Sequence, residues 1–207
     1  RAASDGRQTR GHHLASICES RQFRAARGFS TQSPRSKRDL GLFCDMAMPS
    51  TLAVSTVSTL QRIEGVLRKV DALPIPHSLR PRVETILVRQ AAKLMDGALP
   101  WQRGHGRRTA VLARTIGSSA GLSPDSLHHL TLAALLHDIG LLALPPTLVS
   151  HLGCLDVQSY ADRQSHPRVG AQWLEPYRFL KKASVIIAHH HERWDGSGYP
   201  YGIRGTF

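Results

Sequence analysis

Residues 135–140 read LLHDIG, and they place an imidazole and a carboxylate, His137 and Asp138, directly after an apolar run. Neutral imidazole and carboxylate together suit Mn, Fe, Zn and similar ions. Successive residues of a helix point about 100° apart, so one of the two can face a metal while the other bridges to a neighbouring ion. Because two side chains alone bind an ion weakly, this pattern predicts further ligands from other helices.

Histidines that can join this pair lie in three other segments, at His105, His166, His190 and His191. Singly, each has an ordinary explanation: His105 fits a solvated or capping residue at a helix start, and His166 precedes a proline of the kind favoured in a first helical turn. The order and spacing of the whole set favour a shared site instead. We interpret the other histidines as surface or local packing residues: His12, His13, His77, His128, His129 and His151.

Residues 189–200 read HHHERWDGSGYP and complete the pattern. The series of H, HD, HP with a following Val-Gly, HHE and D-G-x-G-Y-P resembles the HD-GYP family, phosphohydrolases that open cyclic dinucleotides with a cluster of metal ions. The resemblance covers residues 99–207. It implies a centre of two divalent transition-metal ions, Fe or Mn, held by six residues: His105, His137, Asp138, His166, His190 and His191.

The same resemblance implies that Asp138 is the bridging carboxylate and that it forms the catalytic pair with His137. Two ions a few ångströms apart can clamp a phosphodiester and lower the pKa of a bridging water for in-line attack on phosphorus. Glu192, beside the HH pair, has two interpretations. It orients a metal ligand without binding the metal itself, or it forms an exposed salt bridge.

Three departures from the family pattern bear on activity. Leu141 stands where the family usually has a lysine whose ammonium meets a substrate phosphate. Trp101 stands where some members have a glutamate for an additional metal, which favours a two-metal centre. The family's last metal-ligand aspartate belongs further along the chain than Phe207, so we expect a domain truncated at its C-terminal end.

The segment after the HH pair is expected to form a sharp turn, because glycine and proline favour turns. The resemblance implies that this loop shapes the mouth of the pocket and docks a dinucleotide-synthesising partner domain of the GGDEF type. The alternative is a rigid loop with no interaction role. The loop residues concerned are Asp195, Gly196, Gly198, Tyr199 and Pro200.

Long runs of Leu, Ala and Val with Ser, Gly and Pro at their edges predict an all-α protein, since no alternating strand pattern persists. The resemblance makes this an HD-superfamily helical bundle. We expect an N-terminal helical segment over residues 48–98, which either packs on the core or links a sensor to the catalytic unit. The expected helices cover residues 52–71, 81–97, 104–120, 123–138, 167–174 and 177–191.

Two of these helices carry specific expectations. In the helix over residues 104–120, we expect Val111, Leu112 and Ile116 to face inward. Ser123 is expected to cap the next helix, which has proline at its first position and an acidic residue in its first turn.

Composition limits the partners. The chain has 207 residues, 41% of them apolar, and a net charge of +12, which favours anionic partners such as a dinucleotide. The sequence contains no basic stripe with interleaved aromatics, so we do not predict binding to a nucleic-acid polymer. No run approaches the length of a membrane-spanning helix. Three cysteines without a CxxC pair, Cys18, Cys44 and Cys154, favour a reducing, cytoplasmic location.

Residues 1–47 differ from the rest. Residues 1–45 hold nine Lys or Arg residues against four acidic ones, without a helical apolar period, and we expect disorder there. Either this stretch is a translated leader upstream of a start at Met46 or Met48, or it is a transit peptide.

Three functions compete at this point. The first is a metal-dependent phosphodiesterase for cyclic di-GMP or a related cyclic dinucleotide in bacterial signalling. The second is a catalytically silent relative that serves as a binding or docking module, which Leu141 favours. The third is another HD-type phosphohydrolase that cleaves nucleotides, against which the GYP segment argues.

Overall fold

The computed structural model describes residues 51–145, 148–149 and 157–205. The only β pairing within these residues is an isolated bridge between Asp195 and Arg204, so the all-α prediction is confirmed for this part of the chain. The predicted leader and all three cysteines lie outside the described residues. The helices are α2 (Thr51–Ala72), α3 (Arg80–Ala98), η1 (Pro100–Gln102), α4 (His105–Ser119), α5 (Pro124–Leu136), η2 (Ile139–Ala143), α7 (Val157–Arg163), α8 (His166–Leu174), η3 (Arg178–Leu180) and α9 (Lys181–Ala188).

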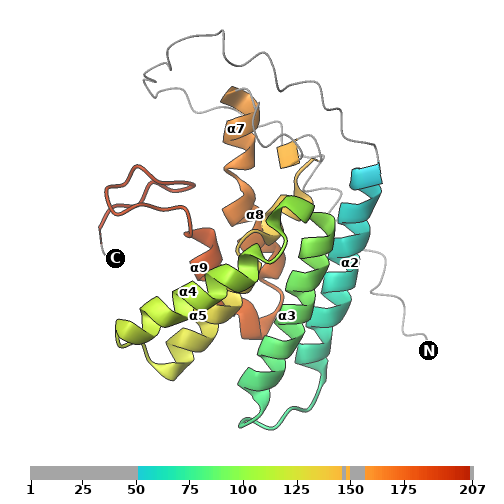
Figure 1. Cartoon of the computed structure of the whole chain (residues 1–207), viewed down its shortest axis with the longest axis vertical. Helices are drawn as coiled ribbons and strands as arrows, with labels where there is room; N and C mark the ends of the chain where they lie inside the picture. Colours follow the sequence, from blue (N-terminus) through green and yellow to red (C-terminus); the bar gives the residue numbers. More distant parts are fainter. Residues whose placement is uncertain (1–50, 146–147, 150–156, 206–207) are drawn as a thin grey trace, which may run out of the picture. The chain divides into compact units, whose positions relative to one another are not determined.

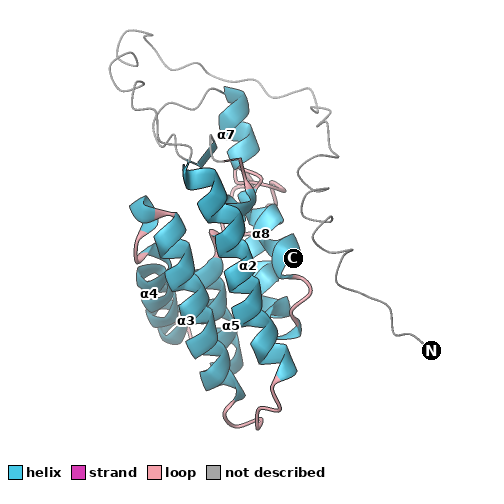
Figure 2. Ribbon diagram, turned by 90° about the vertical axis from the view of Figure 1, so that its right-hand side faces the viewer, coloured by secondary structure: helices cyan, strands magenta, loops and turns pink. Residues whose placement is uncertain are grey.

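Helices α2 and α3 lie side by side and form the N-terminal pair (Figures 1 and 2). The buried residues of α2 recur every three or four positions, as on one face of an amphipathic helix: Leu60, Ile63, Leu67 and Val70. Val57, three positions before Leu60, is exposed. Helix α3 contacts both α4 and α5, and the pair shares one hydrophobic core with the rest of the described chain.

A buried acid joins α3 to α5. Glu84 on α3 is buried, and its Oε2 accepts a hydrogen bond from Nε2 of His128 on α5 at 2.8 Å. Arg80, one turn earlier on α3, lies 3.6 Å from the other oxygen. Buried charges of this kind persist when they are paired and hydrogen-bonded. His128 therefore packs locally, as the sequence predicted.

Helices α4 and α5 pack closely through small residues. A Cβ on Gly106 of α4 would lie 2.7 Å from the backbone oxygen of Leu135 on α5, and Ala110 and Gly117 are the buried positions of α4. The large apolar residues of α4 lie on its solvent-exposed side, because the close approach of α4 to α5 leaves no room for them between the two helices. The prediction that they face inward is therefore wrong: Val111 is 62% exposed, Leu112 63% and Ile116 67%.

Helix α5 leads from a capped start to the HDIG segment. The Ser123 hydroxyl accepts the backbone N–H of Ser126 at 3.2 Å, which confirms the predicted cap. The helix ends at Leu136, after a buried apolar run, and the chain then tightens into η2. His137 and Asp138 thus occupy the junction of two helices instead of the interior of one.

Gly140 allows η2 to approach α8. A Cβ at this position would overlap the backbone oxygen of His166 and lie 2.7 Å from the backbone nitrogen of Gly170. No side chain other than a hydrogen atom fits between the two segments. The glycine of HDIG therefore brings His166 within reach of the residues that precede η2.

None of the helices within residues 51–145 and 157–205 combines the length and the apolar character that a membrane span requires.

Candidate metal centre

The carboxylate of Asp138 lies between two sets of histidines. Its Oδ1 lies 3.2 Å from Nε2 of His166 and 3.8 Å from Nε2 of His190. Its Oδ2 lies 3.2 Å from Nε2 of His137 and 3.7 Å from Nε2 of His105. Asp138 is buried, with its side chain only 10% exposed. Each oxygen of one buried carboxylate thus faces its own pair of imidazoles.

All six residues predicted as metal ligands come together. Two groups of potential ligand atoms, each within 4.8 Å of one another, share Asp138: one adds His166, His190 and His191, and the other adds His105 and His137. They reach the site from four places, namely the first residue of α4, the α5–η2 junction, the first residue of α8 and the turn after α9. That convergence satisfies the geometric requirement of the sequence prediction, while metal binding itself stays a prediction.

Trp101 offers no ligand atom to the cluster around Asp138. Its side chain is half-buried and packs against the hydrophobic core. It belongs to neither ligand group, and an indole has no lone pair with which to bind a metal.

Three of the histidines are oriented in the same way. Nδ1 of His137, of His166 and of His190 lies 3.0, 2.9 and 2.7 Å from the backbone oxygen of the residue three positions earlier. A carbonyl oxygen only accepts hydrogen bonds, so each Nδ1 is the donor. In a neutral ring the lone pair then belongs to Nε2, the atom that faces Asp138. Hydrogen bonding of the second ring nitrogen is how proteins orient metal-binding histidines.

The pKa shifts of Asp138 and the histidines around it favour a cation between them. Burial alone would raise the pKa of Asp138, but hydrogen bonds and positive charge from His137 and His166 outweigh it and hold that pKa far below its usual value. Burial lowers the pKa of His190 to about 4. Burial opposes protonation of His137 too, yet hydrogen bonding to Asp138 raises its pKa overall. A carboxylate among imidazoles is stabilised when a proton or a metal ion lies between them.

The spacing of the nitrogen atoms fits a shared ion. Nε2 of His166 lies 3.3 Å from Nε2 of His190, and both atoms carry lone pairs when the rings are neutral. Nε2 of His105 lies 3.0 Å from Nε2 of His137. Ligands about 2.1 Å from one transition-metal ion, at tetrahedral or right angles, lie about 3.0–3.4 Å apart. The residues present therefore fit a divalent ion on each side of Asp138.

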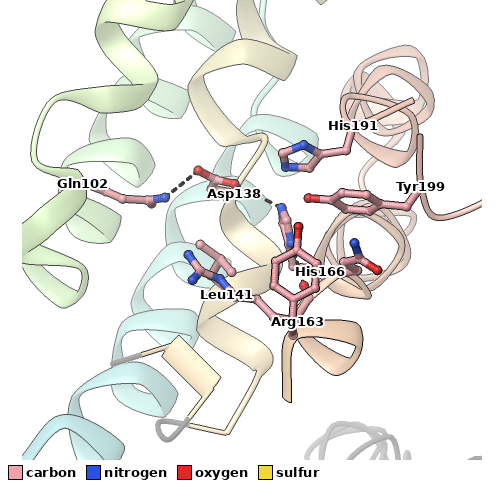
Figure 3. A pocket seen from close by; sticks show the side chains of 9 residues that line it. Gln102, Asp138, Leu141, Arg163, His166, His191 and Tyr199 are labelled. Atoms are coloured by element: carbon pink, nitrogen blue, oxygen red, sulfur yellow. Dashed lines mark hydrogen bonds and ion pairs between the residues drawn. The ribbon is translucent and has the colours of Figure 1, made fainter. Parts of the chain in front are cut away.

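Two cavities meet at the centre, and Figure 3 shows the smaller one. This cavity, of about 210 Å³, contains Asp138, Leu141, Arg163 and Tyr199 in its wall (Figure 3). A larger one, of about 700 Å³, includes His105 and His137 in its wall and lies along α3 and the start of α4. Asp138 and Gln102 line both, so a ligand can reach the carboxylate from either cavity.

Gln102 is a site residue that the sequence did not reveal. Its Nε2 donates a 2.6 Å hydrogen bond to Oδ2 of Asp138 from the short helix η1 (Figure 3). The amide holds the carboxylate in place from the side of α3 and α4. The only sequence signal is a polar residue three positions before His105, which is too common to predict such a role.

The GYP loop is held by Glu192. Its two carboxylate oxygens accept the backbone N–H groups of Tyr201 at 2.6 Å and Ile203 at 3.0 Å. These bonds close the loop that begins after the HH pair. The structure thus gives Glu192 a bracing role that differs from both interpretations drawn from the sequence.

The loop also contacts the histidines that are predicted to bind metal. The ring of Tyr199 stacks on that of His191, with centroids 4.5 Å apart and an interplanar angle of 20° (Figure 3). Asp195 is exposed and accepts hydrogen bonds from the backbone and side chain of Ser197. Gly198 is required by close packing, since a Cβ there would lie 2.5 Å from the Cα of Glu192. Of the predicted loop residues, Tyr199 is thus stacked on a predicted ligand, His191, while Asp195 and Gly198 shape the backbone.

Comparisons with known proteins agree with this geometry. The HD domain family matches residues 89–206, more than half of the chain, so the chain belongs to that family. It is 35% identical over 121 residues to a 3'3'-cGAMP-specific phosphodiesterase of Vibrio cholerae, covering 58% of this chain and 23% of that protein. It is 35% identical over 100 residues to the cyclic di-GMP phosphodiesterase response regulator RpfG of Xanthomonas campestris, covering 47% and 26%.

A third similar protein is a cyclic di-GMP phosphodiesterase of Pseudomonas aeruginosa, 40% identical over 97 residues, which are 45% of this chain and 23% of that protein. The chain spans about a quarter of the length of these curated relatives. The resemblance to the HD-GYP type of HD domain is confirmed by these matches.

Proposed function

We propose that this chain contains the centre of a metal-dependent phosphodiesterase that hydrolyses a cyclic dinucleotide, cyclic di-GMP or 3'3'-cGAMP, in bacterial second-messenger signalling. The observation that carries the proposal is the division of the Asp138 oxygens between two histidine groups. A single buried carboxylate in that position suits a pair of divalent ions. The names of the similar proteins support the substrate class.

The ligand sets follow from the geometry. His105 and His137 would hold one ion, His166, His190 and His191 the other, and Asp138 both. Two such ions, Fe or Mn by resemblance, supply charge to a phosphodiester and lower the pKa of water.

The chain's own residues keep this arrangement in place. Gln102 fixes the orientation of the shared carboxylate through its 2.6 Å hydrogen bond. Backbone carbonyls fix the tautomers of His137, His166 and His190, so that each Nε2 is free to bind. A site whose donors are held in advance loses little entropy when it binds an ion or a substrate.

The larger cavity suits the remainder of a cyclic dinucleotide. Four cationic residues contribute to its wall, on α3 and around the start of α4: Arg89, Lys93, Arg103 and Arg107. A cyclic dinucleotide carries two phosphates, and only one can lie at the metal centre during hydrolysis. Positive charge along the adjoining cavity favours the second phosphate there.

Turnover with supplied metal tests the proposal. The protein, loaded with Mn²⁺ or Fe²⁺, is incubated with cyclic di-GMP and with 3'3'-cGAMP, and the linear products are separated by chromatography. We expect hydrolysis of at least one, abolished by chelation and by Asp138→Asn. Absence of turnover by metal-loaded protein that binds the dinucleotide would favour a silent docking module. Cleavage of mononucleotides alone would favour a different phosphohydrolase.

Two finer statements stay predictions. The GYP loop, braced by Glu192, is expected to dock a GGDEF-type partner domain, and the protein is expected to be cytoplasmic.

A further inference from the structure

The smaller cavity contains one arginine and no lysine. Its wall is made of nine residues, and Arg163 at the end of α7 is the only one of them with a permanent positive charge. Leu141, which lines the same cavity, is apolar and buried (Figure 3). Any anion that approaches Asp138 through this cavity therefore meets Arg163 as its only fixed cation.

The guanidinium of Arg163 has no acidic partner within the part of the chain that the structure describes. Other arginines there do pair: Arg68 with Glu64, Arg80 with Glu84 and Arg193 with Asp195.

The position of Arg163 is tied to the metal centre. Its backbone oxygen accepts the 2.9 Å hydrogen bond from Nδ1 of His166, one of the predicted ligands. The residue that orients His166 through its main chain thus also places a guanidinium in the same cavity. A half-buried arginine without an acid, next to a predicted cation site, is electrostatically unfavourable unless an anion lies between the two.

We propose that Arg163 binds the phosphate group on which the metal centre acts. Guanidinium forms paired hydrogen bonds with phosphate oxygens in a fixed planar geometry, which Leu141 cannot provide. Gln164 and Tyr160 line the same cavity and add polar groups around the anion. The inference deepens the proposed function, on which it rests, by naming a phosphate-binding residue supplied by α7.

The test uses inorganic phosphate as the probe, together with substrate turnover. Calorimetric titration of phosphate into Mn²⁺-loaded protein is compared for the wild type, Arg163→Met, Arg163→Lys and Arg178→Met. Arg178 is exposed and lines neither cavity, so its variant controls for the loss of one surface charge. We expect Arg163→Met to weaken phosphate binding at least about tenfold, the size of one lost charged hydrogen bond. Arg178→Met should have no effect.

Two further measurements separate this role from a structural one. Metal content and melting temperature should match the wild type in Arg163→Met, because the backbone bond to His166 remains. The double variant Leu141→Lys with Arg163→Met should regain phosphate affinity, since a cation then returns to the wall of the same cavity. In turnover, Arg163→Met should raise KM for the dinucleotide.

Each outcome decides the matter. Unchanged phosphate affinity in Arg163→Met, no phosphate binding by the wild type, or loss of metal in the variant would each overturn the inference. Failure of the wild type to hydrolyse any cyclic dinucleotide, with phosphate binding still dependent on Arg163, would instead overturn the proposed function alone.

Discussion

Replacement of Asp138 by Asn should remove both metal ions at once. The amide keeps the shape of the side chain but loses the negative charge that both histidine groups face. At an effective dielectric constant of about 20, one unit charge about 4 Å away contributes about 4 kcal/mol. A divalent ion loses at least that much, so each ion should bind at least about 1,000-fold more weakly.

Variants that remove a histidine from only one of the two ligand groups make the test specific. His105→Ala removes a ligand from only one group, and His191→Ala from only the other. Metal per chain is measured by mass spectrometry after equilibration at fixed free Mn²⁺. We expect two ions in the wild type, about one in each histidine variant and about none in Asp138→Asn. One full ion retained in Asp138→Asn would refute the claim that this carboxylate serves both groups.

Three more predictions follow from the contacts around the centre. Gly140→Ala should lower the free energy of unfolding by about 1–3 kcal/mol or more and reduce metal binding, because the methyl group displaces His166; a normal denaturation midpoint would contradict this packing. In chelator-treated protein, the contribution of His190 to the free energy of unfolding should fall by up to about 3 kcal/mol between pH 6.5 and pH 4. The folded pKa of His190 is about 4, so in this range only the unfolded chain takes up the proton. Stability should therefore depend less steeply on pH in His190→Gln than in the wild type when both are measured by thermal unfolding, and equal slopes would count against this. Glu192→Gln should speed amide hydrogen exchange in the loop after it, while leaving exchange in α5 unchanged; slow exchange in that loop would show that Glu192 does not brace it.

The sequence predicted which six residues converge because the family pattern consists of chemically distinctive residues in a fixed order. It also predicted helix α5 well, since Ser123 and the proline after it are strong local start signals. Such signals depend on neighbouring residues and need no knowledge of the tertiary structure.

The inner face of α4 was not predictable in the same way. Its large apolar residues suggested a buried stripe, but the helix packs through Gly106, Ala110 and Gly117. Small residues make no hydrophobic pattern, and only the position of α5 decides that the close approach occurs. Gln102 and Arg163 were missed for a related reason: their roles arise from tertiary contacts with Asp138 and with the cavity.

The most direct test of the central claim is anomalous diffraction from crystals of the protein grown with Mn²⁺. The account predicts two anomalous peaks, one on each side of the Asp138 carboxylate, with the histidines divided as the two groups describe. A single peak, or two peaks that do not share Asp138, would contradict it.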